Sequence, residues 1–422
     1  MIRASLRKVL LIVGAVLGLV NAARADFCSD QTDLYMKYLY PKTSQAIGSA
    51  VVTFKLGEKP CFFLVGETEI GKGTLIEKTT VFELASVTKV FTTAILGEHV
   101  PFGLDVYYPV KSYLPPGYDL TSAEEGVTFQ QLATFTGGFW WSDPPHFKKG
   151  VSTQQDFVDA VNGLDPTDAP NGQGPIPGEQ DLPTIQFYSN SSVGFLGQIL
   201  MNMDSTKSRT YSFDANGFSN WISDNLTGPL DMKNTRVHPG GTLATGYLVT
   251  PGKNGKPEAD SVKVGSQWYT PEPPYPWVPW GAAGALRSTA SDMLTFLKAN
   301  ICAHHTSDPD CTDFPSYILS AMATAHNPNE YQPRGLLVDP IIQLGVCGSQ
   351  KEQAWAWIYE APPENNPNNL KPIIFKGGDH KGFAAFIGFS PDKKYGLVIL
   401  VNTHPLSIDP AGVNMIQHTG AK

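Results

Sequence analysis

The segment FELASVTKVFTTAILG occupies residues 82–97 and carries Ser86 and Lys89 three positions apart. Its apolar spacing predicts a helix over residues 85–97. Residues at positions i and i+3 share one face of a helix, so we expect the Lys89 amine within reach of the Ser86 hydroxyl. The Ser86 backbone N–H would then lie at a helix N-terminus, ready to donate to an oxyanion.

A Ser-x-x-Lys pattern is weak by itself, because this chain contains it three times. The other copies span residues 5–8, in the N-terminal leader, and residues 390–393, in a predicted turn. Only Ser86 opens an apolar helix. A serine hydroxyl needs a base before it becomes a good nucleophile, and a neutral lysine can be that base when burial and a nearby cation lower its pKa. We therefore expect Ser86 as nucleophile and Lys89 as its base.

A second motif, Tyr188-Ser189-Asn190, is the only Tyr-x-Asn in the chain. It precedes the apolar-periodic segment 192–201, which predicts a helix. A tyrosine held near two lysines could ionise and relay protons, and Asn190 could donate to a substrate carbonyl. Read singly, Tyr188 is as well explained as a buried side chain and Asn190 as a helix cap.

The third motif is Lys376-Gly377-Gly378, at the end of a predicted strand. The Lys376 ammonium could favour an ionised Tyr188 and attract an anionic substrate. Gly378 would let a substrate backbone lie against the strand edge.

Strands are predicted at both ends of the chain and helices in its middle. The remaining predicted elements are a hairpin of residues 48–54 and 61–65, helices over 128–134 and from Ser288 or Thr289 to Asn300, and strands over 354–359, 371–376, 383–389 and 396–402. The simplest arrangement is an α/β (α+β) fold with one lobe built from both termini, about 40–80 and 335–422, and a mostly helical lobe, about 81–334, inserted between. A ligand cleft would lie between the lobes.

The N-terminus has the three-part form of a secretory signal. Basic residues precede the apolar run Val9 to Val20, and Ala23-Arg24-Ala25 follows as a cleavage pattern. We expect a signal peptide over 1–25, a mature domain over 26–422, and a periplasmic or secreted location without a stable membrane span. The net charge of −8 and the lack of a basic stripe argue against a nucleic-acid partner.

Five cysteines suit an oxidising compartment. Cys302 with Cys311 closes a short polar loop and is the first candidate pair. Cys28 with Cys61 is the second, and Cys347 is then left over. His304 and His305 lie inside the first loop, and a disulfide-closed surface loop explains them better than a metal site because the ligand spacing is absent.

Taken together, Ser-x-x-Lys, Tyr-x-Asn and Lys-x-Gly in this order resemble the penicillin-recognising serine enzymes. Tyr-x-Asn resembles class C β-lactamases and their relatives, which include D-alanyl-D-alanine carboxypeptidases, D-aminopeptidases and esterases. Further segments resemble that family: residues 82–85, 132–136, 229–232, 283–290 and 382–402. The likeness as a whole extends from about residue 48 to residue 402.

The resemblance implies an antiparallel sheet flanked by helices and a role for each motif residue. Ser86 would be acylated, Lys89 would be its base partner and Tyr188 the general base and acid. The other implied groups bind substrate: Asn190, Lys376, Gly378 and Asp379, whose backbone N–H would complete an oxyanion hole with that of Ser86. No metal or cofactor serves in this role, and the substrate would be a small molecule or peptide with a carbonyl acyl donor.

The third motif departs from the family. The usual middle residue carries a hydroxyl that helps to hold a substrate carboxylate, and here it is Gly377. The position after Gly378 is usually small, and here it is Asp379. At an effective dielectric constant of 20, like charges 4 Å apart repel by about 4 kcal/mol. We therefore expect broad, efficient β-lactamase activity to be absent or weak. The first hypothesis is hydrolysis of an amide, a β-lactam or a D-amino-acid peptide, by an exported serine hydrolase of the β-lactamase or DD-peptidase type. The alternatives are a carboxylesterase of the same fold and a non-catalytic binding or scaffold protein that kept it.

Two stretches rich in Pro and Gly, residues 165–183 and 250–280, predict long loops. The second is also rich in aromatic residues. This second stretch could form a hydrophobic lid packed on a core or a surface that contacts substrate. For Trp140 and Trp141, core packing or a lid is the simpler interpretation.

Overall fold

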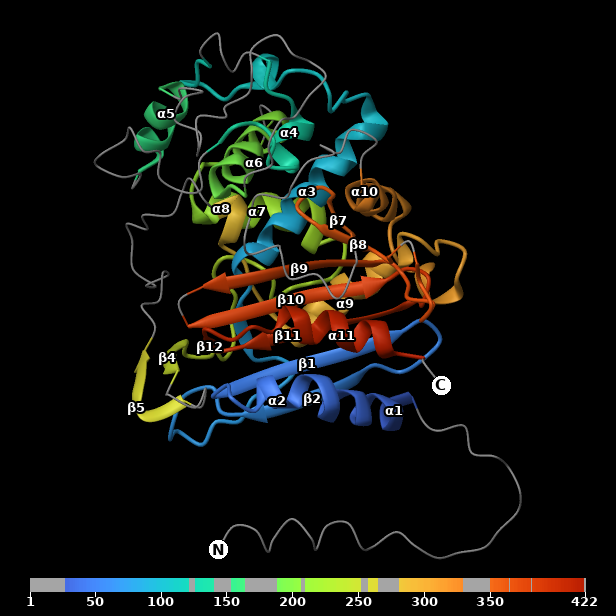
Figure 1. The fold of residues 1–422 in the computed structure, drawn as a ribbon. Helices are drawn as coiled ribbons and strands as arrows, with labels where there is room; N and C mark the ends of the chain where they lie inside the picture. The colour runs from blue at the N-terminus through green and yellow to red at the C-terminus, as the bar shows by residue number, and fades with distance from the viewer. Residues whose placement is uncertain are drawn as a thin grey trace, which may run out of the picture.

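The computed structural model of the 422-residue chain describes residues 27–120, 126–139, 153–163, 188–205, 209–251, 257–264, 281–328, 350–363, 365–380 and 382–420 (Figure 1). The expected signal peptide, the 165–183 stretch, Trp140, Trp141 and Cys347 lie outside these residues.

A seven-stranded antiparallel sheet forms the base of the molecule, in the order β2-β1-β11-β10-β9-β8-β7. Its strands are β1 (Gly48–Lys55), β2 (Cys61–Gly66), β7 (Gln350–Gln353), β8 (Ile358–Ala361), β9 (Ile373–His380), β10 (Phe383–Ser390) and β11 (Tyr395–Val401). The N-terminal strand β1 pairs with the C-terminal strand β11. The prediction of an α/β fold whose sheet is built from both termini is therefore confirmed.

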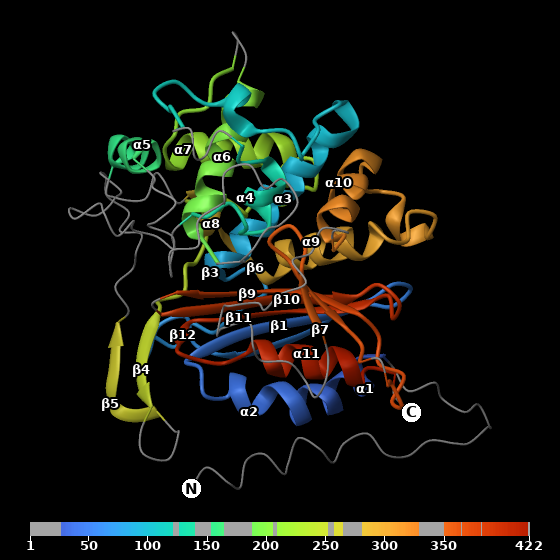
Figure 2. The ribbon, with the colours of Figure 1, turned by 45° about the horizontal axis from the view of Figure 1, so that its top comes forward.

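Helices cover both faces of the sheet (Figure 2). One face carries α1 (Phe27–Leu34), α2 (Tyr40–Thr43) and α11 (Asp409–His418), and the other carries α9 (Ala290–Cys302) and the helices beyond it. Side chains alternate across β1, because successive residues of a strand point to opposite faces. Val52 and Phe54 belong to the core on the α9 side, while Val51 belongs to the core under α11.

The middle of the chain is mainly helical, as predicted. The helices are α3 (Thr88–His99), α4 (Phe129–Ala133), α5 (Gln154–Asn162), α6 (Asn190–Asp204), α7 (Ala215–Ile222), α8 (Gly281–Gly284), α9 and α10 (Ser316–His326). Thr128 caps α4 through the predicted capping box with Gln131, and Thr289 caps α9. Short strands β3 (Val81–Glu83) and β6 (Arg287–Thr289) pair just before the Ser86 turn.

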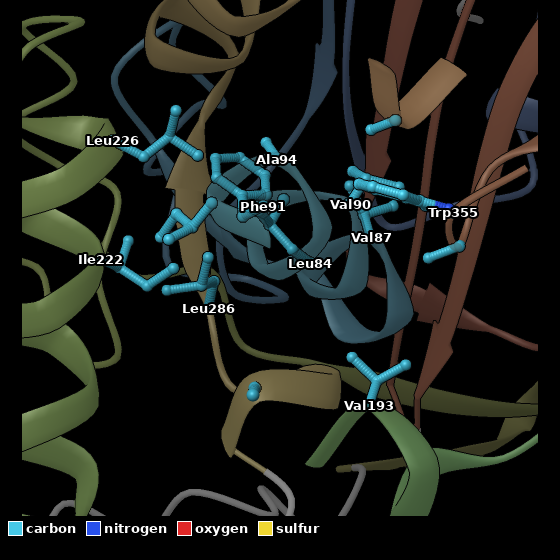
Figure 3. Packing of buried hydrophobic residues seen from close by; sticks show 14 of the residues in the cluster. Leu84, Val87, Val90, Phe91, Ala94, Val193, Ile222, Leu226, Leu286 and Trp355 are labelled. Carbon is cyan, nitrogen blue, oxygen red and sulfur yellow. The ribbon is translucent and has the colours of Figure 1, made fainter. Parts of the chain in front are cut away.

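Helix α3 is buried along most of its length, and this holds the Ser86 turn in place (Figure 3). Val90 and Phe91 contribute to the main core together with Ile222 and Leu286. The Phe91 ring stacks on that of Phe296 in α9, with centroids 3.9 Å apart. A helix enclosed in this way cannot shift without opening a cavity, which costs several kcal/mol in close-packed interiors.

Three predictions about elements need correction. Residues 354–357 form a buried turn, and β8 begins only at Ile358, because Ala356 adopts φ 57° and Gln353 Nε2 donates to two carbonyls of the turn. Strand β9 continues past Lys376 to His380, since β10 pairs along it. Part of the predicted loop 250–280 forms the hairpin of β4 (Tyr247–Pro251) and β5 (Pro257–Val264), and β12 (Thr403–His404) pairs with β4.

Both candidate disulfides are present, so these predictions are confirmed. Cys28 pairs with Cys61 and ties α1 to β2, while Cys302 pairs with Cys311 at the end of α9. Within the described residues, no helix combines the length and the apolar character needed to span a membrane.

Candidate active site

The Ser86 turn lies between β3 and α3. Residues Ala85–Val87 form one turn of 3-10 helix, and α3 continues directly from it, so the predicted helix has a tighter first turn. Ala85 adopts φ 46°, a left-handed conformation that costs on the order of 1–3 kcal/mol and is often found at functional sites. Phe135 at φ 62° and Ala356 at φ 57° line the same cavity as Ser86.

The Lys89 amine is buried within hydrogen-bonding distance of three oxygen atoms. It lies 3.0 Å from Ser86 Oγ, 2.6 Å from Asn190 Oδ1 and 2.7 Å from the Ala283 carbonyl oxygen. Burial, reinforced by the charge of Lys376, lowers the pKa of Lys89 well below its ordinary value. Ala283 is a partner that sequence reasoning missed, because a backbone carbonyl carries no side-chain signal.

Tyr188 reaches Ser86 from the other side. Its hydroxyl lies 2.7 Å from Ser86 Oγ, and its ring packs on Phe135 with centroids 4.9 Å apart. Lys89 Nζ and Lys376 Nζ each lie 4.9 Å from the Tyr188 ring centroid. Tyr188 therefore lies near two lysines, as the sequence predicted.

Asn190 is the first residue of α6, and Ser189 caps that helix. The structure brings Asn190 to the site, where its side-chain oxygen accepts from Lys89. This contact orients the lysine amine, and the role of Asn190 as a donor to a substrate carbonyl stays a prediction.

Strand β9 passes directly beside the Ser86 turn. A Cβ added to Gly378 would lie 3.0 Å from the Ser86 nitrogen and 2.9 Å from the Val87 nitrogen, so only glycine fits here. Strand β8 pairs with β9 only as far as Phe375, and in the described part of the chain no further strand continues that edge. The edge from Lys376 onward faces the cavity, while the Asp379 side chain is about half exposed.

A cavity of about 320 Å³ opens next to Ser86. Besides Ser86, Tyr188, Lys376 and Asp379, it is lined by residues that the sequence did not indicate: Phe135, Lys351, Gln353, Ile358, His404, Asp409 and their neighbours. Phe135 follows α4, Lys351 and Gln353 lie in β7, Ile358 begins β8, His404 ends β12 and Asp409 begins α11. No local motif marks them, because only the tertiary fold brings these segments beside β9.

The Asp409 carboxyl group lies directly against Gly377. A Cβ added at Gly377 would meet Asp409 Cγ at 2.6 Å and Oδ1 at 2.7 Å. Burial, followed by the charge of Asp379, raises the pKa of Asp409 to about 7, while Lys376 and Lys351 act in the opposite direction.

The second Ser-x-x-Lys copy in the described residues has a structural role. Ser390 is buried at the end of β10, and Lys393 Nζ donates to the Ile416 and Thr419 carbonyl oxygens, both at 3.0 Å, at the end of α11. His304 contacts His326, and His305 contacts the Pro391 carbonyl. Among the residues that the structure describes, no group of three or more His, Cys, Asp or Glu side chains is arranged to hold a metal ion.

Comparisons with known proteins agree with this geometry. The chain matches the model of the Beta-lactamase family over residues 33–414. It is 24% identical over 377 residues to a beta-lactamase of Yersinia enterocolitica, covering 84% of this chain and 82% of that protein. It is 25% identical over 390 residues to the D-alanyl-D-alanine-carboxypeptidase/endopeptidase AmpH of Escherichia coli K12, covering 90% and 86%.

A solved structure shares the fold. The beta-lactamase/D-alanine carboxypeptidase of Pseudomonas syringae superposes with a TM-score of 0.63 at 18% identity, covering 92% of this chain and 98% of that one. The family match spans nearly all described elements, including every motif around Ser86. The chain therefore belongs to the Beta-lactamase family and is a serine hydrolase.

Proposed function

We propose that this protein hydrolyses an amide through an acyl-enzyme on Ser86, in the manner of β-lactamases and D-alanyl-D-alanine peptidases. The hydrogen bonds of Lys89 carry the proposal. Burial and the charge of Lys376 lower the Lys89 pKa and so favour the neutral amine, which has two N–H donors and one lone pair. The Ala283 carbonyl and Asn190 Oδ1 can only accept, so they take the two donors. The lone pair is then left for the Ser86 hydroxyl proton.

The chemistry follows from this arrangement. Lys89 takes the Ser86 proton while Oγ attacks the carbonyl carbon, and the Ser86 and Asp379 N–H groups stabilise the resulting oxyanion. The Tyr188 hydroxyl, 2.7 Å from Oγ, donates a proton to the leaving amine as the acyl bond breaks. Water then attacks the acyl-enzyme while the Tyr188 phenolate takes a proton from it, and the Lys89 ammonium returns a proton to Ser86 Oγ as the acid leaves, which restores all three groups. Lys376 holds positive charge beside Tyr188 throughout.

We further propose that the protein is exported after cleavage behind Ala25. The two disulfides support this location, because such bonds persist in oxidising compartments. The mature domain would then span residues 26–422, with the lobe boundaries given above.

Covalent labelling tests the acyl-enzyme. Fluorescent penicillin or a fluorophosphonate should label the wild type and fail to label Ser86→Ala. Ser390→Ala is the matched control, because it removes the serine of the second Ser-x-x-Lys copy and should label normally. If neither probe labels the wild type, the proposed acyl-enzyme is contradicted and the binding-protein alternative is favoured.

The acyl donor is tested with a substrate panel. D-alanyl-D-alanine peptides, nitrocefin and p-nitrophenyl butyrate report peptidase, β-lactamase and esterase activity. A specific observation keeps the carboxylesterase as second candidate: Gly377 has no hydroxyl, and Asp409 occupies the adjacent space. Turnover of the ester alone would favour that candidate over an amide hydrolase.

A further inference from the structure

We propose that Asp409 is the specificity-determining residue of this site, and that it selects acyl donors bearing a hydrogen-bond-donating group, such as a primary amide or an amine, over those bearing a free carboxylate. The inference deepens the proposed function and rests on it. It concerns the end of the cavity beside Gly377, away from the reacting Ser86 hydroxyl.

The position of Asp409 accounts for the glycine at position 377. A side chain at 377 would begin where the Asp409 carboxyl lies, so this carboxyl would have to shift. Gly377 is therefore explained by Asp409 rather than by a backbone requirement, since Gly377 does not adopt the left-handed conformation. A hydroxyl-bearing residue at 377 is replaced by a carboxyl group that enters from another element, at the start of α11.

Charged and titratable groups surround the Asp409 carboxyl. The charged and titratable groups that face it are Lys376 and Asp379 from β9, Lys351 from β7 and His404 from β12. Two acids therefore stand opposite two lysines and a histidine. The two lysines already balance the two acids, so a substrate carboxylate placed here would add an uncompensated negative charge beside the buried Asp409 carboxyl, and like charges at close range repel. An amide N–H or an ammonium group would instead donate to Asp409.

The raised pKa of Asp409 adds a dependence on pH. Burial raises this pKa to about 7, so the carboxyl is largely protonated in mild acid and ionised in mild base. A protonated Asp409 can donate to a substrate carboxylate, whereas an ionised one repels it. Discrimination against carboxylate substrates should therefore increase from pH 6 to pH 8.

The test compares matched substrates that differ in one group. One pair is a D-alanyl-D-alanine peptide with a free C-terminus and its C-terminal carboxamide. The other pair is the p-nitrophenyl ester of succinic acid and that of succinamic acid. The pairs place the carboxylate on opposite sides of the scissile bond, so they also report which side reaches Asp409. The readout is the ratio of kcat/KM for the neutral substrate to that for the anionic one.

In the wild type we expect this ratio to exceed ten for at least one pair and to rise with pH. In Asp409→Asn, which keeps the shape of the side chain, the ratio should fall at least tenfold and lose its pH dependence. Asp231→Asn is the matched control, because its exposed carboxylate lies outside the cavity lining and should leave the ratio unchanged. An unchanged ratio in Asp409→Asn, or an equal change in Asp231→Asn, would overturn the assignment.

A second comparison tests the steric part without catalysis. Gly377→Thr should lower the melting temperature, because the new Cβ overlaps the Asp409 carboxyl. The double variant Gly377→Thr, Asp409→Ala should recover most of that loss and accept the carboxylate substrates better than the wild type. Equal melting temperatures for the single and double variants would contradict the geometry. Absence of all Ser86-dependent turnover would instead refute the proposed function, and this inference with it.

Discussion

Gly378 of β9 lies so close to Ser86 that a Cβ at position 378 would be 3.0 Å from the Ser86 nitrogen. Strand β9 thus packs directly against the turn that carries the nucleophile Ser86. The N–H proposed to bind the oxyanion sits at this contact, so its position depends on the strand as much as on the helix.

Gly378→Ala should lower kcat/KM by about 10²-fold, the usual cost of displacing reacting groups by about 1 Å. The added methyl group must push the backbone of the Ser86 turn away from β9. Steady-state kinetics with the best substrate of the panel measure the effect. Gly126→Ala is the control, because a Cβ there meets no atom within 4 Å. Equal activity of the two variants would show that the contact is not critical.

Lys376→Met should move the acid limb of the pH–rate profile upward by about one pH unit. Lys376 lowers the pKa of Lys89, since a neighbouring positive charge disfavours a second one. Without that charge the Lys89 pKa rises, and the neutral amine becomes available only at higher pH. The profile of kcat/KM is best recorded in an Asp409→Asn background, so that Asp409 does not contribute a limb.

For the same measurement, Lys233→Met removes an exposed positive charge far from the described cavity and should leave the limb in place. If the acid limb of the pH–rate profile also stays in place in Lys376→Met, the proposal that Lys89 is the base is contradicted.

Glu83→Gln should destabilise the protein by about 3–5 kcal/mol, the typical cost of breaking a buried ion pair. Glu83 Oε1 lies 3.1 Å from Arg287 Nη2, and both side chains are at most 6% exposed. The substitution leaves the Arg287 guanidinium buried without its anion. Chemical denaturation measures the change. Asp231→Asn breaks an exposed pair with Lys233 and should have little effect on stability, because water screens an exposed ion pair. Similar losses in both variants would refute this explanation.

Removal of either disulfide should destabilise the protein, and the loss should be larger for the bond that closes the longer loop. The Cys28–Cys61 bond closes a sequence separation of 33 and the Cys302–Cys311 bond one of 9. Loop-closure entropy predicts a loss of about 3.7 kcal/mol for the first and about 2.6 kcal/mol for the second. Paired Cys→Ala variants compared by denaturation provide the measurement. A larger loss for the short loop would indicate that native contacts, rather than chain entropy, dominate.

The sequence was sufficient for the elements whose signals are local. The apolar spacing after Ser86 predicted α3, the Thr128 and Gln131 pair predicted the start of α4, and short apolar runs predicted β10 and β11. Local signals were misleading at residues 354–357, where the apolar residues are buried in a turn. Periodicity reports burial, and a buried turn carries the same apolar residues as a buried strand.

Motif order was likewise enough to nominate Ser86, Lys89, Tyr188, Asn190 and Lys376, because each motif keeps its chemistry within a few residues. Asp409 carries no such signal. It lies 32 residues after Gly377 in the chain and meets it only because α11 packs across β9 and β10. A contact between segments distant in sequence depends on sheet order and helix packing, and so the tertiary structure alone decided which group stands where the motif lacks its hydroxyl.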